Sequence, residues 1–224
     1  MYLFLYIVPV FLMITAQSMV TSAYHRYRQI RSIKGYTGEM IAHLILDRNN
    51  VSDVDVCVND RGQLSDFYDP KLKRVCLSSE VYYGNSIASI AIAAHECGHA
   101  LQDAENFGLI AIRNKILPYV NISSNVGWAI LVLGFISNSI NFVNIALCLL
   151  IFATLFQVLT LPIELDASKR ALQQLTYNAM ILEEEKLEVK NMLKAAAFTY
   201  VAALIAALAY IFRIILIFGN NRRR

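Results

Sequence analysis

Four long apolar stretches are the feature that most constrains the fold of this chain. They cover residues 2–24, 119–137, 142–162 and 195–218, and Arg213 is their only charged residue. Each has about the ~20 residues that a helix needs to cross a ~30 Å hydrocarbon layer. The chain as a whole is 57% hydrophobic and only 17% charged, which is too apolar for an ordinary soluble domain. We therefore expect an integral membrane protein with about four transmembrane helices.

The residues that flank these stretches indicate how they are used. We expect residues 1–24 to remain as an anchor, because the basic residues follow the apolar stretch, whereas a signal peptide carries them in front. Residues 119–162 are predicted to form a helical hairpin with a short polar turn at 138–141. Residues 195–224 form a last helix and a basic tail. Within that helix Arg213 either reaches toward the membrane surface or marks an early helix end.

The charges exclude several classes of function and predict an orientation. The net charge is only +3, and the basic residues lie beside apolar stretches, which argues against nucleic-acid binding. The nine glycines form no phosphate-binding loop, so no nucleotide is expected. Eleven Lys and Arg residues lie in 24–118, five in 163–194 and none in the hairpin turn. This distribution predicts a protein of the cell membrane whose two polar segments lie on the cytoplasmic side. Four crossings then leave the basic residues 222–224 outside, against the same rule. The sequence does not indicate an oligomeric state.

The first polar segment, residues 25–118, combines helices with a small β element. Apolar residues at helical spacing predict a short helix in 36–50. Residues 51–79 alternate apolar and polar side chains on both sides of a turn, which predicts strand, turn and strand. Cys57 and Cys76 fall in the two strands and are interpreted as small buried thiols, since a disulfide between them would require an oxidising compartment. The predicted fold is mainly α with a small β element.

The helix predicted at residues 86–106 contains the motif that carries chemistry. It begins with Ser86 as a plausible cap and includes His95-Glu96-Cys97-Gly98-His99, an H-E-x-x-H sequence. Four residues advance a helix by about 400°, so His95 and His99 project from one face and can bind one zinc ion per chain. Glu96 is rotated to the side, where it can act as general base on a zinc-activated water.

Alternative interpretations remain at this point. The two histidines could be isolated core residues, although each would then need its own partner in an apolar helix, whereas one zinc ion serves both. The zinc could also be structural or sensory in a non-catalytic membrane protein. A catalytic zinc needs a third protein ligand, and Glu164 or Asp166 could supply it. These two carboxylates lie about 200° apart on a helix, so we expect only one of them to face the H-E-x-x-H helix.

Five blocks of sequence resemble a known family, the YugP-type neutral zinc metallopeptidases. They are DFYDPKLKRVCLS, SIASIAIAAHECGHALQDAENF, LPYVNISSNVGW, TLPIELDASKRAL and AAAFTYVAAL, and they occur in the order and spacing of the family. The resemblance implies a membrane-bound zincin that hydrolyses peptide bonds in peptides or membrane proteins. The related glutamate zincins take their third ligand from a Glu-x-x-Ala-Asp pattern, which implies Glu164 as the third zinc ligand, in a helical segment at 163–194.

The chain departs from the family pattern at two positions. Ser168 stands where the pattern has Asp, so Asp166 could act in its place as the carboxylate behind the ligands. Phe67 stands where the family usually has His. By analogy with related zincins, residues 73–78 are expected to form an exposed edge strand that binds extended peptide. No residue is an evident oxyanion stabiliser, and Tyr68, Tyr200 and Arg170 are the polar candidates.

Overall fold

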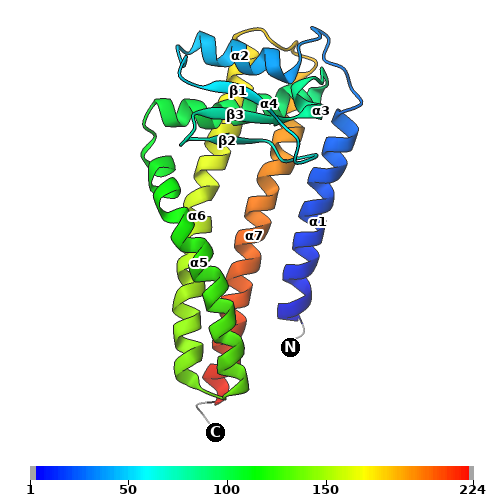
Figure 1. The fold of residues 1–224 in the computed structure, drawn as a ribbon. Coiled ribbons are helices and arrows are strands. Elements are labelled where there is room, and N and C mark those ends of the chain that lie inside the picture. The colour runs from blue at the N-terminus through cyan, green and yellow to red at the C-terminus, as the bar shows by residue number, and fades with distance from the viewer. Residues whose placement is uncertain (1–3, 222–224) are drawn as a thin grey trace. The chain divides into compact units, whose positions relative to one another are not determined.

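The computed structural model describes residues 4–221, so the predicted tail residues 222–224 lie outside the described part. The helices are α1 (Phe4–Tyr27), α2 (Gly38–Arg48), α3 (Ser79–Tyr82), α4 (Ile87–Ala104), α5 (Gly108–Ile136), α6 (Ile140–Tyr177) and α7 (Lys186–Asn221), and the strands are β1 (Asp55–Asn59), β2 (Phe67–Asp69) and β3 (Arg74–Ser78) (Figure 1). The prediction of a mainly helical chain with a small β element is confirmed.

Within residues 4–221, four helices are long and apolar enough to span a membrane, as predicted. They are α1, α5, α6 and α7. All four extend beyond the apolar stretches at one end at least. The helix α6 continues through Pro162 to Tyr177. Residues 163–177 of the segment predicted at 163–194 therefore belong to the same helix as the apolar stretch 142–162. The helix α7 continues past Arg213, so the early helix end suggested for that residue is wrong, and its guanidinium lies 4.6 Å from the centre of the Tyr210 ring.

The chain divides into two compact units, and the first of them consists of helices alone. Its described residues are 4–17, 111–162 and 199–221. The helices α5 and α6 form the predicted hairpin, and Ser123 Oγ donates a hydrogen bond to the carbonyl of Leu149 at 3.0 Å. The Trp128 ring of α5 meets the Tyr210 ring of α7 edge-on at 5.6 Å. These contacts hold the three helices side by side in this unit (Figure 1).

The second unit comprises Ser18–Ile110 and Ile163–Phe198 and holds the candidate site. Its core forms around α4, which is apolar on nearly every side, and residues of α2 and β3 pack against it. Fully buried members include Ile41 and Ile45 of α2, Val75 and Leu77 of β3, and Ile90 of α4. Because this one core surrounds α4, the side chains that α4 presents to its neighbours are held in fixed places.

The small sheet has the strand order β1-β3-β2, and one of its strands was not predicted. β3 pairs in parallel with β1 and antiparallel with β2. The alternating pattern predicted β1 and β3, but the residues of β2 were expected to lie in the turn between them. β3 is therefore the central strand, and the expectation that residues 73–78 form the exposed edge is wrong. The edge strand on that side is β2.

The structure joins Cys57 and Cys76 in a disulfide between β1 and β3. The two residues are direct register partners, with their Cα atoms 4.8 Å apart. Val75 and Leu77, the neighbours of Cys76 along β3, point into the core, so the disulfide lies on the opposite, half-exposed face of the sheet. The interpretation of both residues as buried free thiols was wrong.

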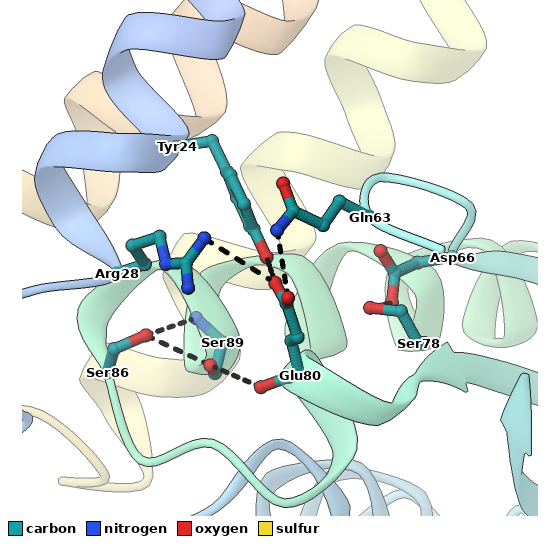
Figure 2. Close-up of polar contacts among 8 residues, drawn as sticks. All are labelled: Tyr24, Arg28, Gln63, Asp66, Ser78, Glu80, Ser86 and Ser89. Carbon is teal, nitrogen blue, oxygen red and sulfur yellow. Dashed lines mark hydrogen bonds and ion pairs between the residues drawn. The ribbon is translucent and has the colours of Figure 1, made fainter. Parts of the chain in front are cut away.

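The last turn of α1 is tied to α3 through one carboxylate (Figure 2). The Tyr24 hydroxyl donates to Glu80 Oε2 at 2.6 Å, and the Gln63 amide donates to Glu80 Oε1 at 2.8 Å. The Arg28 guanidinium lies 3.7 Å from the same carboxylate. Hydrogen bonds from Tyr24 and Gln63 lower the pKa of Glu80. Glu80 thus links α1, the β1–β2 loop and α3 within this unit.

The start of α4 is fixed by a serine cap, as predicted. The Ser86 hydroxyl accepts a hydrogen bond from the backbone N–H of Ser89, and its Oγ lies 2.9 Å from Ser89 Oγ (Figure 2). A cap of this kind satisfies one of the free N–H groups in the first turn of a helix. The cap fixes the residue at which α4 begins. It thereby fixes the direction in which the H-E-x-x-H side chains project from the helix.

Candidate metal site

His95 and His99 lie one turn apart on α4, and their rings face the same carboxylate. The ring centres are 4.9 Å apart. Both Nε2 atoms lie 3.4 Å from Oε2 of Glu164 on α6. The ligand atoms of the three residues all lie within 4.8 Å of one another. Of the His, Cys, Asp and Glu residues that the structure describes, these are the ones grouped so that they could hold a metal ion.

The two distances to Glu164 fit a zinc ion shared by the three side chains. Ligand atoms about 2.1 Å from a tetrahedral zinc lie about 3.4 Å from one another, which is the separation between Glu164 Oε2 and each Nε2 atom. The same 3.4 Å is long for a direct charge-assisted hydrogen bond, which has a length of about 2.7–2.9 Å. Two imidazole nitrogens and one carboxylate oxygen are also ligands that zinc prefers.

The second ring nitrogen of each histidine has a partner of its own. His95 Nδ1 lies 3.2 Å from Ser168 Oγ, and His99 Nδ1 lies 3.0 Å from Gln102 Oε1. Such partners orient the rings of metal-binding histidines. The related pattern has Asp at position 168, and here Ser168 is the partner of His95 at that position. Gln102 was not anticipated from the sequence; its position one helical turn after His99 is the signal that could have indicated it.

The structure brings Glu164, and not Asp166, to the histidines. Glu164 is only 2% exposed, whereas the Asp166 side chain is 29% exposed. Asp166 Oδ2 accepts hydrogen bonds from the Gln102 amide at 2.9 Å and from Arg170 Nε at 2.6 Å. Both carboxylates thus reach α4, Glu164 at the two histidines and Asp166 at Gln102, so the expectation that only one of them faces the H-E-x-x-H helix is wrong.

Glu96 follows His95 on α4 and is buried. Burial raises the pKa of Glu96 to about 7, although the neighbouring His95 lowers it. The charges of Asp66 and Glu164 raise this pKa further, and hydrogen bonding from the Tyr68 backbone lowers it. Because of this hydrogen bond, the main chain of Tyr68 in the edge strand β2 lies next to Glu96.

Two of the three polar groups suggested as oxyanion stabilisers are engaged elsewhere. The Tyr68 hydroxyl donates to Asp103 Oδ2 at 2.7 Å. The Arg170 guanidinium lies 2.7 Å from Glu105 and also bonds Asp166. The third candidate, Tyr200, belongs to the helical unit. No local sequence pattern indicates these pairings, because each joins residues from different elements or from successive turns of a helix.

Comparison with known proteins agrees with this geometry. A family model described as "Putative neutral zinc metallopeptidase" matches residues 2–219. The chain belongs to this family. It is 40% identical over 222 residues to a Bacillus subtilis (strain 168) protein named "Putative membrane protease YugP", and the match covers 99% of this chain and 98% of the relative. No solved structure matches the chain. In this zinc metallopeptidase family member, the three grouped side chains of α4 and α6 are the candidate zinc site.

Proposed function

We propose that this chain is a membrane-bound, zinc-dependent endopeptidase of the gluzincin type. The observation that carries the proposal is the grouping of His95, His99 and Glu164 around one point, with Glu96 buried beside them. The three grouped side chains would hold one zinc ion per chain. When bound, zinc polarises the scissile carbonyl and lowers the pKa of water, which are the effects that amide hydrolysis needs most.

Glu96 is the general base of the proposed reaction. Its carboxylate takes a proton from the attacking water and passes it to the leaving amine. The group of possible ligands has three members in the described chain, so a fourth coordination position stays open. An open position is typical of catalytic zinc, whereas a structural zinc uses four protein ligands. This difference favours an enzyme over a non-catalytic protein with structural or sensory zinc.

The edge of β2 is the proposed binding place for an extended peptide. β2 is bonded to β3 on one side, and the Tyr68 main chain on this strand lies next to Glu96. A peptide that adds to this edge as a further strand would run past the general base. Main-chain hydrogen bonds would then provide affinity with limited dependence on side chains.

We further propose that the substrates are peptides or membrane proteins cut near the bilayer, on the cytoplasmic side. Glu164 follows the apolar stretch 142–162 by two residues on the continuous helix α6. The sixteen Lys and Arg residues of segments 24–118 and 163–194 support the cytoplasmic side.

The Glu96→Gln variant tests the proposed activity. The purified protein in detergent is incubated with a fluorogenic peptide library, and zinc is measured in parallel. We expect the variant to retain zinc and to lose at least about 100-fold in turnover, because a general base contributes about 10²- to 10⁴-fold. Glu184→Gln, at an exposed position of the same unit, is the matched control. Near-normal turnover by Glu96→Gln would exclude the proposed base.

A further inference from the structure

Gln102 occupies a central place between α4 and α6. Its side chain is completely buried. Its Nε2 donates to the carbonyl of Ile163 at 2.8 Å and to Asp166 Oδ2 at 2.9 Å. Its Oε1 lies 3.0 Å from His99 Nδ1. A single amide thus connects one of the grouped histidines with the helix that carries Glu164.

These contacts determine which way round the Gln102 amide lies. A backbone carbonyl and a carboxylate oxygen can only accept hydrogen bonds, so the two partners on one side require the NH₂ group there. Arg170 Nε donates to the same Asp166 oxygen at 2.6 Å and so holds the carboxylate in place. The carbonyl oxygen of Gln102 must therefore face His99. The hydrogen-bond network makes this assignment, since amide oxygen and nitrogen are hard to distinguish by position alone.

The orientation of Gln102 in turn determines the tautomer of His99. An amide oxygen can only accept, so His99 Nδ1 must carry the hydrogen. A neutral imidazole has one protonated nitrogen, which leaves the lone pair on Nε2. That nitrogen lies 3.4 Å from Glu164 Oε2, on the side where the metal would bind. The Ser168 hydroxyl beside His95 can donate or accept, so it imposes no such choice on His95.

We propose that Gln102 is the positioning residue that holds His99 in its metal-binding tautomer, and that Asp166 keeps the Gln102 amide in the required orientation. The proposal rests on the metal site of the proposed function but not on peptidase activity. It assigns Asp166 an indirect role, through Gln102, in place of direct contact with a histidine ring.

The test is the dissociation constant for zinc, measured by competition with a chromophoric chelator. We expect Gln102→Leu to bind zinc about 10- to 100-fold more weakly, as is typical when the partner of a ligand histidine is lost. Asp166→Ala should weaken binding in the same direction, because the Gln102 NH₂ group then keeps only the Ile163 carbonyl as an acceptor and the amide is held less firmly. Asp166→Asn keeps an oxygen acceptor for the Gln102 NH₂ group and should bind nearly as tightly as wild type.

A matched control comes from a second glutamine that links two helices. Gln174 of α6 bonds Asn49 after α2 at 3.1 Å and follows Glu164 by ten residues on the same helix. Gln174→Leu should leave zinc affinity unchanged. Thermal unfolding of the chelator-treated proteins shows which variants fold. If Gln102→Leu does not fold, the two Asp166 variants provide the test.

Two results would overturn the proposal. One is zinc binding by Gln102→Leu within about threefold of wild type, because orienting partners contribute more than that. The other is equal weakening by Asp166→Ala and Asp166→Asn. The proposed function fails in a different way. If the zinc affinities follow the expected order but no peptide is cut, the positioning role stands and the peptidase is rejected; if wild type binds no zinc, both are rejected.

Discussion

Gly98 of α4 lies directly against the main chain of Ala167 on α6. A Cβ atom at Gly98 would be 2.6 Å from the carbonyl oxygen of Ala167. Ala167 is itself fully buried, so two small residues let the helices approach closely. Gly98 lies between His95 and His99 in the chain, and Ala167 comes one turn after Glu164. This close approach brings the carboxylate to the two rings.

Gly98→Ala is therefore expected to separate the ligands. The added methyl group must push the two helices apart, because it meets backbone and not a flexible side chain. We expect a loss of about 1–3 kcal/mol in the free energy of unfolding, as is typical for an overpacked core, together with weaker zinc binding. Urea unfolding and zinc analysis measure both effects. Gly108→Ala is the control, since a Cβ there meets nothing within 4 Å. Equal behaviour of the two variants would contradict the packing argument.

The cysteines test the proposed orientation. Disulfides are rare in the cytoplasm, so the Cys57–Cys76 pair should be reduced inside cells and should oxidise during purification in air. A thiol-reactive mass tag added after acid quenching should then label all four cysteines of the chain in intact cells. It should label two in the purified protein, Cys97 and Cys148. An oxidised pair in freshly quenched cells would indicate that this unit faces an oxidising compartment.

The same disulfide should stabilise the purified protein. It closes a loop with a sequence separation of 19, and a loop of that size is associated with about 2–4 kcal/mol. Cys57→Ser should therefore unfold at lower urea than wild type without reductant. With a strong reductant the difference should nearly disappear, and a difference that persists would show that the serine disturbs packing instead.

Asp66 should make stability depend on pH. Its Oδ1 accepts hydrogen bonds from the Ser78 N–H at 2.7 Å and the Ser78 hydroxyl at 3.1 Å. Its Oδ2 is buried and accepts no hydrogen bond from any residue that the structure describes. Burial raises the pKa of Asp66, so the folded state prefers the protonated form. The stabilising contribution is present below the ordinary Asp pKa and is lost as pH rises through the folded value.

Asp66→Asn removes this titration and keeps an oxygen acceptor for Ser78. The unfolding free energy of chelator-treated wild type, minus that of the variant, should fall as pH rises above about 4. Urea unfolding from pH 4 to 8 measures this difference. A difference that is constant over the range would show that Asp66 has the same pKa in the folded and unfolded states.

N-methylated peptides test the edge of β2 without altering the protein. A methyl group on a backbone nitrogen removes one main-chain donor, and a strand presents alternate N–H groups to its neighbour. In a peptide that pairs with β2, methylation at alternate residues should raise KM about tenfold, while the residues between should have little effect. A methyl scan with no alternation would exclude strand addition.

The sequence predicted the features that depend on local pattern. The length of the apolar stretches predicted the four long helices. The separation of His95 and His99 by four residues predicted that they share a helix face. It missed features that depend on contacts between distant segments. β2 has only three residues and is formed by pairing with β3, so no local pattern indicated it. The link from Gln102 to Ile163 and Asp166 crosses more than sixty positions of the chain, and it becomes visible only when α4 and α6 are packed together.

The central claim is that His95, His99 and Glu164 hold one zinc ion. The most direct test is the zinc-to-protein ratio of detergent-purified wild type and Glu164→Ala, determined by elemental analysis after dialysis, with circular dichroism to confirm that the variant is folded. We predict about one zinc per chain in wild type, and loss of most of it in a folded variant. Equal zinc in both proteins, or none in either, would contradict the assignment.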